Sequence, residues 1–589
     1  TPLDKYTRGE GWRMAVILNG SIVNTATVSS PLRDSVSISG SFTQREANRL
    51  EADLKAGSLT FAPHILSEKN VSPELGLRDR AMGIIATIVA LVLVILVMVG
   101  YYRFAGFIAS IAVLFNLLII WATLQNISAT VTLAGIAGII LTVGMAVDAN
   151  VLVFERIREE FAVSGRIASA VHAGYKKAFS AILDSNVTTI IAALILLHFD
   201  SGPIKGFAVT LIIGIASSMF TALFLTRYFF GGWVENPKNK VLKMSNWIKK
   251  TDFNFLKYGK VSLYSTIAVA LVGGYLLVSQ RSTMLGMDFT GGYSVSLEVE
   301  AKDINGDYQN AVEKALIAAG ATAQDFQVRS LSPANNIKIL LGRSLDQTGK
   351  PFYNMPLETD KKGVSFPYQN NPRLVWVVDA LEKNGLTLTP QAIKQLESNW
   401  TSISGQMSNA MRNNAILGLS IALLCILAYI TFRFEFKYAI SATLGLAIDV
   451  AITMAFVSIL HALKVPVQID LNTIAALMTI IGYSLNDTII IFDRIREDLK
   501  RMRKHSFKDV VNHALNVTLS RTVMTSGTTL VVLLALLFLG GSAIFGLSLV
   551  MVIGVIFGTF SSLFIAAPLL LFFHKKERSK AEKIAMHEN

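Results

Sequence analysis

The sequence predicts an α-helical polytopic membrane protein that also carries α+β domains outside the membrane. Three observations predict this fold class: 52% of the 589 residues are hydrophobic, only 16% are charged, and the mean hydropathy is +0.49. A soluble globular protein has about 25% charged residues. The composition therefore excludes a cytosolic enzyme, a nucleic-acid-binding protein and a disordered scaffold. We assign the net charge of +13 to basic loops on one side of a membrane.

Eleven stretches are apolar enough to cross a bilayer, which takes about 18 or more residues. The predicted spans are 81–102, 105–125, 131–154, 178–198, 205–230, 261–279, 414–432, 437–461, 472–493, 521–540 and 544–573. Two regions, 1–80 and 281–412, are too polar to cross.

Lys and Arg in the short loops predict the orientation. The basic segments are 155–177, 231–260, 494–520 and the tail after Phe573. The loops 125–130 and 540–546, on the opposite side, carry no Lys or Arg. The basic side is therefore expected to be cytoplasmic, with both polar regions facing outward. This orientation places Thr1 outside, so we expect a first spanning helix that is absent from this chain.

The outward region 281–412 alternates strand-like and helical segments. YSVSLEVE and IKILLG read as strands, and DYQNAVEKALIAAG, VDALEKNG and PQAIKQLESNW read as helices. This alternation predicts an α+β domain of the ferredoxin-like kind. The glycine-rich GMDFTGG (286–292) reads as a turn that leads into a strand. Within 11–62 we expect a strand pair (WRMAVILNG and SIVNTATVSS), a strand (SISGSF) and a helix (TQREANRLEADLKAG).

The chain contains an internal repeat. GMAVDANVLVFERIREE (144–160) matches GYSLNDTIIIFDRIRED (482–498), and 178–194 matches 518–534 at nearly the same offset. Both halves run in the same direction. We therefore predict two six-helix pseudo-repeats related by an axis along the membrane normal.

Ionisable residues inside the predicted spans indicate the functional site, because a charge at the centre of a span costs about 2.5–3.5 kcal/mol. Such residues are Asp148, Asp184, Asp449, Asp487, Arg227 and Arg521. Asp148 and Asp487 lie in equivalent helices of the two repeats. Arg521 opens the next helix of the second half, where the first half has Ala181.

Two carboxylates and one guanidinium in a low-dielectric bundle form a set that a proton can switch. Burial favours the neutral carboxyl, whereas a nearby Arg favours the carboxylate. The alternative is a permanent salt bridge that pins two helices. A carboxylate pair with Ser and Thr neighbours also suits Na⁺. For Asp449 two roles stay open, a functional one and a hydrogen bond to a neighbouring helix.

Other chemistry is sparse. The chain has no Walker A sequence, so ATP hydrolysis is not expected. Its eight His residues lack metal-ligand spacing, and the single cysteine, Cys425, allows no intrachain disulfide. We therefore expect no enzyme activity, no cofactor and no metal.

These motifs resemble the bacterial SecD and SecF protein-export membrane proteins fused in one chain. Residues 11–230 resemble the later part of SecD, with LKAGSLTFAP and GMAVDANVLVFERIREE. Residues 250–573 resemble nearly all of SecF, with GMDFTGG, FRFEFKYA and IGYSLNDTIIIFDRIRE. The beginning of SecD is absent, and both WTSISGQMSNAM and Ile448 depart from the usual SecF pattern.

The resemblance implies a member of the resistance–nodulation–division superfamily in the bacterial inner membrane, with large periplasmic domains. It implies that the protein uses the proton gradient to help complete preprotein passage after SecA has driven the chain through SecYEG. YajC and YidC are further implied partners, beside unfolded preproteins and the lipid bilayer. By motif position, Asp148, Asp487 and Arg521 correspond to the family's proton-pathway residues.

The resemblance also implies a division of the chain into SecD-like and SecF-like parts. The expected parts are 1–80 (end of the SecD-like periplasmic domain), 81–232 (SecD-like membrane helices), 233–260 (basic cytoplasmic linker), 261–280 (first SecF-like helix), 281–412 (SecF-like periplasmic domain), 413–573 (SecF-like membrane helices) and 574–589 (basic cytoplasmic tail). Two other functions stay open: a proton-coupled exporter of small molecules or lipids from the same superfamily, and a non-catalytic assembly scaffold.

Overall fold

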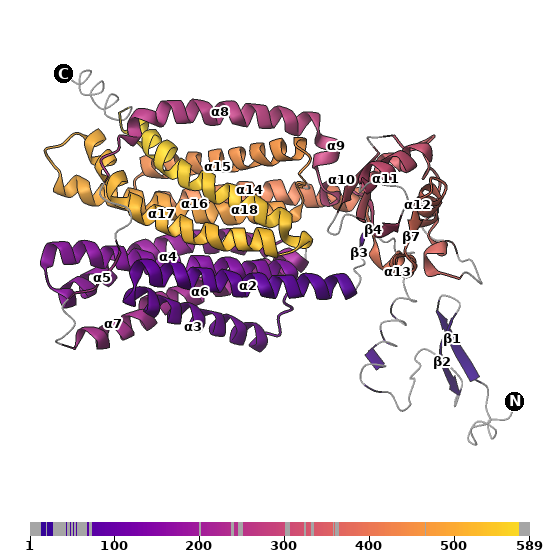
Figure 1. Ribbon diagram of the computed structural model, residues 1–589, viewed down its shortest axis with the longest axis horizontal. Helices are drawn as coiled ribbons and strands as arrows, with labels where there is room; N and C mark the ends of the chain where they lie inside the picture. The colour runs from indigo at the N-terminus through magenta and orange to yellow at the C-terminus, as the bar shows by residue number, and fades with distance from the viewer. Residues whose placement is uncertain are drawn as a thin grey trace, which may run out of the picture. The chain divides into compact units, whose positions relative to one another are not determined.

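Figure 1 shows the fold in a computed structural model. The structure describes residues 13–18, 21–27, 43, 47–48, 51, 55, 67–69, 73–199, 202–236, 241–245, 251–300, 307–322, 325–330, 335–356, 359, 365–465 and 467–575. The chain divides into two units, Thr1–Ile65 and Leu66–Asn589, which are treated separately below.

The first unit contains an antiparallel strand pair, β1 (Arg13–Leu18) and β2 (Ser21–Thr27). The pair confirms the two strands predicted there. The predicted strand at 37–42 lies outside the described residues. Of the predicted helix at 43–57, residues 43, 47–48, 51 and 55 are described, and all of these except Thr43 are helical.

In the described part of the second unit, eleven helices are long and apolar enough to cross a membrane, as predicted. They are α2 (Pro73–Tyr102), α3 (Phe104–Asn126), α4 (Leu133–Ser164), α5 (Ile167–Leu196), α6 (Gly202–Phe220) with α7 (Thr226–Val234), α8 (Phe255–Ser279), α14 (Gly405–Arg433), α15 (Phe436–Ala462), α16 (Leu471–Arg501), α17 (Phe507–Leu539) and α18 (Ser542–Ser561). The helices α6 and α7 are joined by a π-helical turn, η2 (Thr221–Leu225), and a second π-helical turn, η6 (Ser562–Ala566), follows α18.

Two predicted loops are mostly helix. The segment 155–177 holds the end of α4 and the start of α5, which are separated at Gly165 with φ +66°. The segment 494–520 holds the end of α16 and the start of α17, whose N-cap is Ser506. Hydropathy marks only the apolar part of a helix. Charged residues at i, i+3 and i+4 spacing continue the helix beyond that part.

The helix α16 lies at the centre of the bundle. The most apolar 18-residue stretch of α16 is entirely buried, whereas only 17% of the most apolar 18-residue stretch of α8 is buried. The helix packs against α5, α15, α17 and α18. Two glycines of α18 allow the close approach: Gly554 faces Ile480, and Gly558 faces Ser484.

A reciprocal pair of glycine contacts joins the two halves. A Cβ atom at Gly144 on α4 would lie 3.3 Å from the Thr529 Cα on α17. A Cβ atom at Gly482 on α16 would lie 2.8 Å from the Thr189 Cα on α5. Each half therefore contributes two helices to the interface between the halves, one through a glycine and the other through a threonine.

The region 281–412 forms a sheet covered by helices. Its strands are β4 (Gly292–Glu300), β5 (Phe326–Ser330), β6 (Asn336–Leu341), β7 (Thr387–Leu388) and β8 (Trp400–Ile403), and its main helices are α11 (Tyr308–Ala318), α12 (Pro372–Glu382) and α13 (Pro390–Gln395). A further strand, β3 (Ser67–Lys69), comes from the segment before α2. The antiparallel order is β3-β8-β4-β6-β5, with β7 beside β4.

The motif 286–292 forms the turn predicted before β4. It contains one helical turn, α10 (Met287–Thr290), which is followed by Gly291 at φ +68° and Gly292 at φ +123°. These backbone conformations suit glycine. A side chain at Gly292 would also collide with the Leu341 carbonyl on β6.

Candidate functional site

The three predicted site residues lie on three helices of the bundle and are brought together across the two halves. Asp148 is on α4, Asp487 on α16 and Arg521 on α17, and their exposed fractions are 9%, 5% and 5%. The Arg521 Nη2 lies 3.9 Å from the Asp148 Oδ1. Within the described residues, the Nε and Nη1 atoms of Arg521 and the Oδ1 of Asp148 make no hydrogen bond. Among the described residues, the buried guanidinium therefore has one ion pair, which is long.

Asp487 is held by hydroxyl groups. The Ser526 Oγ donates to its Oδ2 at 3.2 Å, and the Thr525 Oγ1 lies 3.5 Å from its Oδ1. Both hydroxyls belong to α17, the helix that carries Arg521. The Tyr483 hydroxyl, one turn before Asp487, donates to the Thr529 Oγ1 at 3.1 Å. The hydroxyls of Thr525, Ser526 and Thr529 on α17 therefore face α16.

Asn486 connects Asp148 to the neighbouring helix α5. One of its amide atoms lies 3.5 Å from the Asp148 Oδ2. In the amide orientation that satisfies both atoms, the nitrogen donates to the Ser185 carbonyl at 2.9 Å. The amide oxygen then faces Asp148, and it can accept a hydrogen bond only from a protonated carboxyl.

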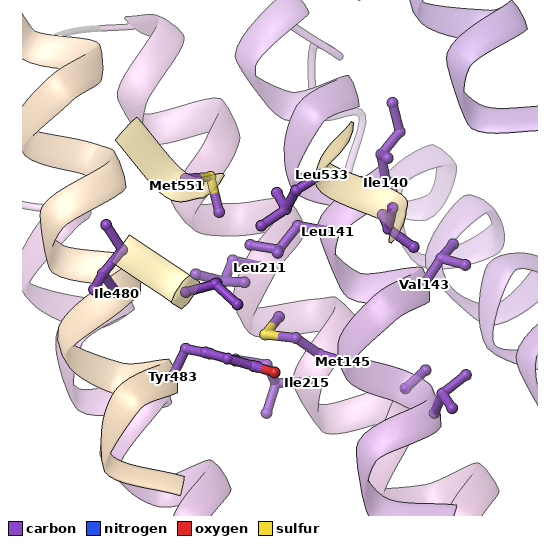
Figure 2. Packing of buried hydrophobic residues seen from close by; sticks show 14 of the residues in the cluster. Ile140, Leu141, Val143, Met145, Leu211, Ile215, Ile480, Tyr483, Leu533 and Met551 are labelled. Carbon is purple, nitrogen blue, oxygen red and sulfur yellow. The ribbon is translucent and has the colours of Figure 1, made fainter. Parts of the chain in front are cut away.

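An apolar layer covers one side of the three charges. Figure 2 shows Ile140, Leu141 and Met145 of α4 lying among Leu211, Ile480, Leu533 and Met551, and all seven are buried. We call these seven residues the apolar layer. On α4 and α16 its members precede Asp148 and Asp487. They therefore lie toward the end where α16 adjoins the 281–412 domain, here called the outer end.

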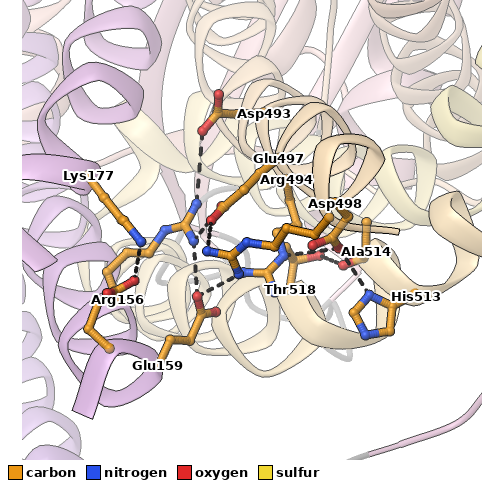
Figure 3. Close-up of polar contacts among 12 residues, drawn as sticks. Arg156, Glu159, Lys177, Asp493, Arg494, Glu497, Asp498, His513, Ala514 and Thr518 are labelled. Carbon is orange, nitrogen blue, oxygen red and sulfur yellow. Dashed lines mark hydrogen bonds and ion pairs between the residues drawn. The ribbon is translucent and has the colours of Figure 1, made fainter. Parts of the chain in front are cut away.

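A crossed ion-pair cluster lies on the opposite side of the charges (Figure 3). The Arg156 Nη1 on α4 donates to the Glu497 Oε2 on α16 at 3.0 Å. The Arg494 Nη1 on α16 donates to the Glu159 Oε2 on α4 at 2.8 Å. These four residues are the crossed cluster. Its two bonds relate equivalent positions of the two repeat motifs.

Further charges extend the cluster. The Arg494 Nε donates to the Asp498 Oδ2 at 3.2 Å, and the His513 Nδ1 lies 3.0 Å from the same oxygen. Sequence reasoning used these basic residues for the orientation and for the internal repeat, and it did not find the cluster. The available signal was the shared R-I-R-E pattern, in which Arg and Glu recur three residues apart in both halves.

Asp184 does not join the three charges. Its carboxylate accepts from the Arg433 Nε on α14 at 2.7 and 2.9 Å, and from the Tyr429 hydroxyl at 3.1 Å. Asp184 and Arg433 therefore form a separate ion pair between the halves. Arg433 lies in FRFEFKYA, where its charge gave no indication of this partner.

The outer end of α16 is bonded to the motif 286–292. The Gly286 N–H donates to the Ile469 carbonyl at 2.8 Å, and the Ile469 N–H donates to the Met284 carbonyl at 2.9 Å. The Leu471 N–H, in the first turn of α16, donates to the Asp288 Oδ2 at 3.2 Å. The strand β4 starts at Gly292, directly after this motif. These hydrogen bonds thus connect α16, which carries Asp487, to the 281–412 domain, here called the outer domain.

Comparison with known proteins identifies the family. Residues 54–235 and 387–576 match the family described as "Protein export membrane protein SecD/SecF, C-terminal". The chain belongs to the SecD/SecF family. Residues 4–61 match the P1 head subdomain of SecDF, so the chain has the fused SecDF form. With eleven candidate spans in its described part, it is a multi-pass membrane protein.

Curated SecDF relatives match nearly the whole chain. The protein translocase subunit SecDF of Brucella abortus is 32% identical over 98% of this chain and 71% of its own length. The SecDF subunit of Bacillus subtilis is 31% identical over 98% of this chain and 75% of its own length. A SecD subunit of Desulfurispirillum indicum is 47% identical over 38% of this chain.

Two solved SecDF structures have the same fold. A crystal structure of SecDF from Thermus thermophilus, titled a translocon-associated membrane protein, matches with a TM-score of 0.78 and 29% identity, over 97% of this chain and 73% of that one. SecDF in the "super-membrane-facing form" matches with a TM-score of 0.66 and 27% identity, over 99% of this chain and 74% of that one.

Proposed function

We propose that the protein is a proton-motive-force-driven accessory component of the bacterial Sec translocation machinery. It assists late preprotein translocation and release on the periplasmic side. Family membership supports the Sec pathway. One observation carries the proton-driven part: among the described residues, the ion pair of the buried Arg521 guanidinium is the 3.9 Å contact with Asp148 of the first half.

The charge balance of the site favours proton exchange. With Asp148 and Asp487 both ionised, Arg521 leaves one negative charge uncompensated in the buried site. One proton restores neutrality, and a buried unpaired charge is strongly unfavourable. Proton uptake therefore changes which acid Arg521 attracts, and the helices that carry these groups move relative to one another. One charge that crosses 100 mV supplies about 2.3 kcal/mol.

Barriers on both sides of the site support alternating access. The apolar layer excludes water from the outer side, and the crossed cluster holds α4 and α16 together on the other side. A proton reaches the site from outside when the apolar layer parts. It leaves when the bonds Arg156–Glu497 and Arg494–Glu159 open.

The outer domain converts helix movement into work on the preprotein. The helix α16 carries Asp487 at its centre and is bonded through Leu471 and Ile469 to the motif before β4. A shift of α16 along its axis therefore displaces the strand at the centre of the outer sheet. Unfolded preprotein outside the membrane is the proposed load.

The remaining parts of the proposal follow from the family. We propose a bacterial inner-membrane location, periplasmic domains, partners SecYEG, SecA, YajC and YidC, no enzyme activity, and the division into SecD-like and SecF-like parts given above. The strand order β8-β4-β6-β5 supports a ferredoxin-like outer domain. The reciprocal contacts Gly144–Thr529 and Gly482–Thr189, and a π-helical turn in the last span of each half, support the pseudo-repeat.

The test is preprotein secretion by membrane vesicles with and without a proton gradient. Asp148→Asn, Asp487→Asn and Arg521→Ala are each expected to insert normally and to abolish the gradient-dependent stimulation. Asp252→Asn is the matched control, because Asp252 is exposed in the linker before α8. If the folded site variants show normal stimulation, the proton-driven function is contradicted and the non-catalytic assembly scaffold explains the protein better.

A further inference from the structure

Asp449 is a buried acid that the three-charge site does not use. It lies in the middle of α15 and is 2% exposed. Its Oδ2 accepts a hydrogen bond from the Ser484 Oγ on α16 at 2.5 Å. The Ser561 hydroxyl, directly before the π-helical turn η6, also lies near this carboxyl. Asp449 is therefore surrounded by hydroxyl groups of two neighbouring helices.

No cation compensates this carboxyl within the part of the chain that the structure describes. The helix α15 packs against α8, α14, α16, α18 and η6. Their titratable groups are Lys257, Tyr258, Lys260, Tyr264 and Tyr275 on α8; Arg412, Cys425, Tyr429 and Arg433 on α14; and Tyr483, Asp487 and the charges of 493–501 on α16. Neither α18 nor η6 contains a titratable residue. Tyr483 and Asp487 bond to α17 instead, and Arg433 pairs with Asp184.

Two oxygen atoms at this place have no hydrogen-bond partner among the described residues. They are the Asp449 Oδ1 and the Oγ1 of Thr453, one turn further along α15. An ionised carboxylate would be buried here with hydroxyl donors and no counter-charge, which is strongly unfavourable. A protonated carboxyl is neutral and can donate a hydrogen bond. The surroundings therefore favour the protonated form in this conformation.

The first half provides a neutral counterpart. Asn116 is buried in α3, and its Oδ1 accepts from the Ser217 Oγ on α6 at 2.9 Å. A mid-membrane amide bonded to a serine of the last span resembles the arrangement of Asp449 and Ser561. The second half thus carries an acid where the first half carries an amide of the same shape. Only the acid can exchange a proton.

We propose that Asp449 is a second proton-binding site, separate from Asp148, Asp487 and Arg521. This inference rests on the proposed proton-driven function. Ser484, which bonds Asp449, lies three residues before Asp487 on α16. When α16 moves away, the contact with Ser484 opens and water can reach the carboxyl, which then releases its proton to that water. The protonation of Asp449 thereby depends on the position of α16 relative to α15 and α18.

Infrared spectroscopy of the full chain in lipid tests the site directly. A protonated carboxyl has a carbonyl band that an ionised one lacks. We expect a band that is absent from Asp449→Asn, present in Asp487→Asn, and lost as the pH is raised. A band that persists unchanged at every pH would mean a permanently neutral structural acid. Absence of the band at every pH would mean a permanent carboxylate. Either result overturns the proposal, as does loss of the band on adding Na⁺ at constant pH.

Secretion by the same variant distinguishes this inference from the proposed function. Asp449→Asn keeps the shape seen at Asn116, so it is expected to fold normally and to lose gradient-dependent stimulation. Full stimulation in a folded Asp449→Asn protein would contradict the inference alone, provided that Asp487→Asn is inactive. Full stimulation in both Asp449→Asn and Asp487→Asn would contradict the proposed proton-driven function itself.

Discussion

Arg521 on α17 lies 3.9 Å from Asp148 on α4, and this ion pair joins a helix of the second half to a helix of the first. The distance is long for a buried pair, because charge-assisted hydrogen bonds measure about 2.7–2.9 Å. Arg521 also keeps two nitrogen atoms without a partner among the described residues. A loosely paired guanidinium of this kind suits a site that rearranges in each cycle rather than one that pins two helices.

The crossed cluster is expected to hold the inner ends of α4 and α16 together. Arg156→Glu should lower the free energy of unfolding by about 1–3 kcal/mol, because it places two negative charges beside each other. The double variant Arg156→Glu/Glu497→Arg should recover part of that loss. Thermal unfolding of the purified protein measures both effects.

The pair Lys177–Glu160 provides the control for this prediction. Lys177 lies beside the cluster in Figure 3 and is more exposed than Arg156. Glu160→Gln should therefore change stability by less than about 1 kcal/mol. Equal losses in Glu160→Gln and Arg156→Glu would show that the crossed geometry has no special role.

The close approach of α16 and α5 at Gly482 is expected to tolerate no side chain. A Cβ atom there would lie 2.8 Å from the Thr189 Cα, so Gly482→Ala must push the helices apart. We expect the free energy of unfolding of Gly482→Ala to be about 1–3 kcal/mol lower than that of the unmodified protein. Gly527→Ala is the matched control, because no atom lies within 4 Å of its added Cβ. Similar melting temperatures for the two variants would contradict the described packing.

Asp288 is expected to couple the bundle to the outer domain. Asp288→Ala removes the acceptor of the Leu471 N–H while leaving the three charges in place. Proton uptake should therefore persist, whereas gradient-dependent secretion should fall. Asp307→Ala serves as the control, because Asp307 caps the exposed start of α11. Joint loss of proton uptake and secretion in Asp288→Ala would instead mean that the motif supports the site itself.

The outer domain is expected to lose stability in acid through Asp325. Burial raises the pKa of Asp325, but hydrogen bonds from Lys350 at 2.6 Å and from Thr322 outweigh burial and hold it below the ordinary 3.8. A lowered pKa in the folded state contributes stability above the unfolded value of 3.8. This stability is lost as the pH falls below that value.

Hydrogen exchange of β5 and β6 in the full chain measures this effect. Protection in the unmodified protein should decrease as the pH falls below about 3.8, after correction for intrinsic exchange. Asp325→Asn should already be less protected at neutral pH, and its protection should depend less on pH. Identical pH profiles would show that Lys350 and Thr322 do not stabilise the carboxylate.

The sequence predicted the spans and the three charges for simple physical reasons. Hydropathy over about 20 residues is a strong signal, and an acid in such a stretch is rare enough to indicate a site. The pairing partners could not be predicted this way. Arg433 meets Asp184, and Ser484 turns to Asp449 although it lies one turn from Asp487, because helix packing decides which neighbour each side chain faces. The inner ends of α4 and α16 were read as loops, which concealed the crossed cluster.

Proton flux into sealed proteoliposomes tests the central claim most directly. With an imposed pH gradient and an internal pH-sensitive dye, the unmodified protein should acidify the lumen faster than empty liposomes. Asp148→Asn, Asp487→Asn and Arg521→Ala should each reduce the flux to the empty-liposome rate while unfolding at the usual temperature. Undiminished flux in any one of these folded variants would contradict the account.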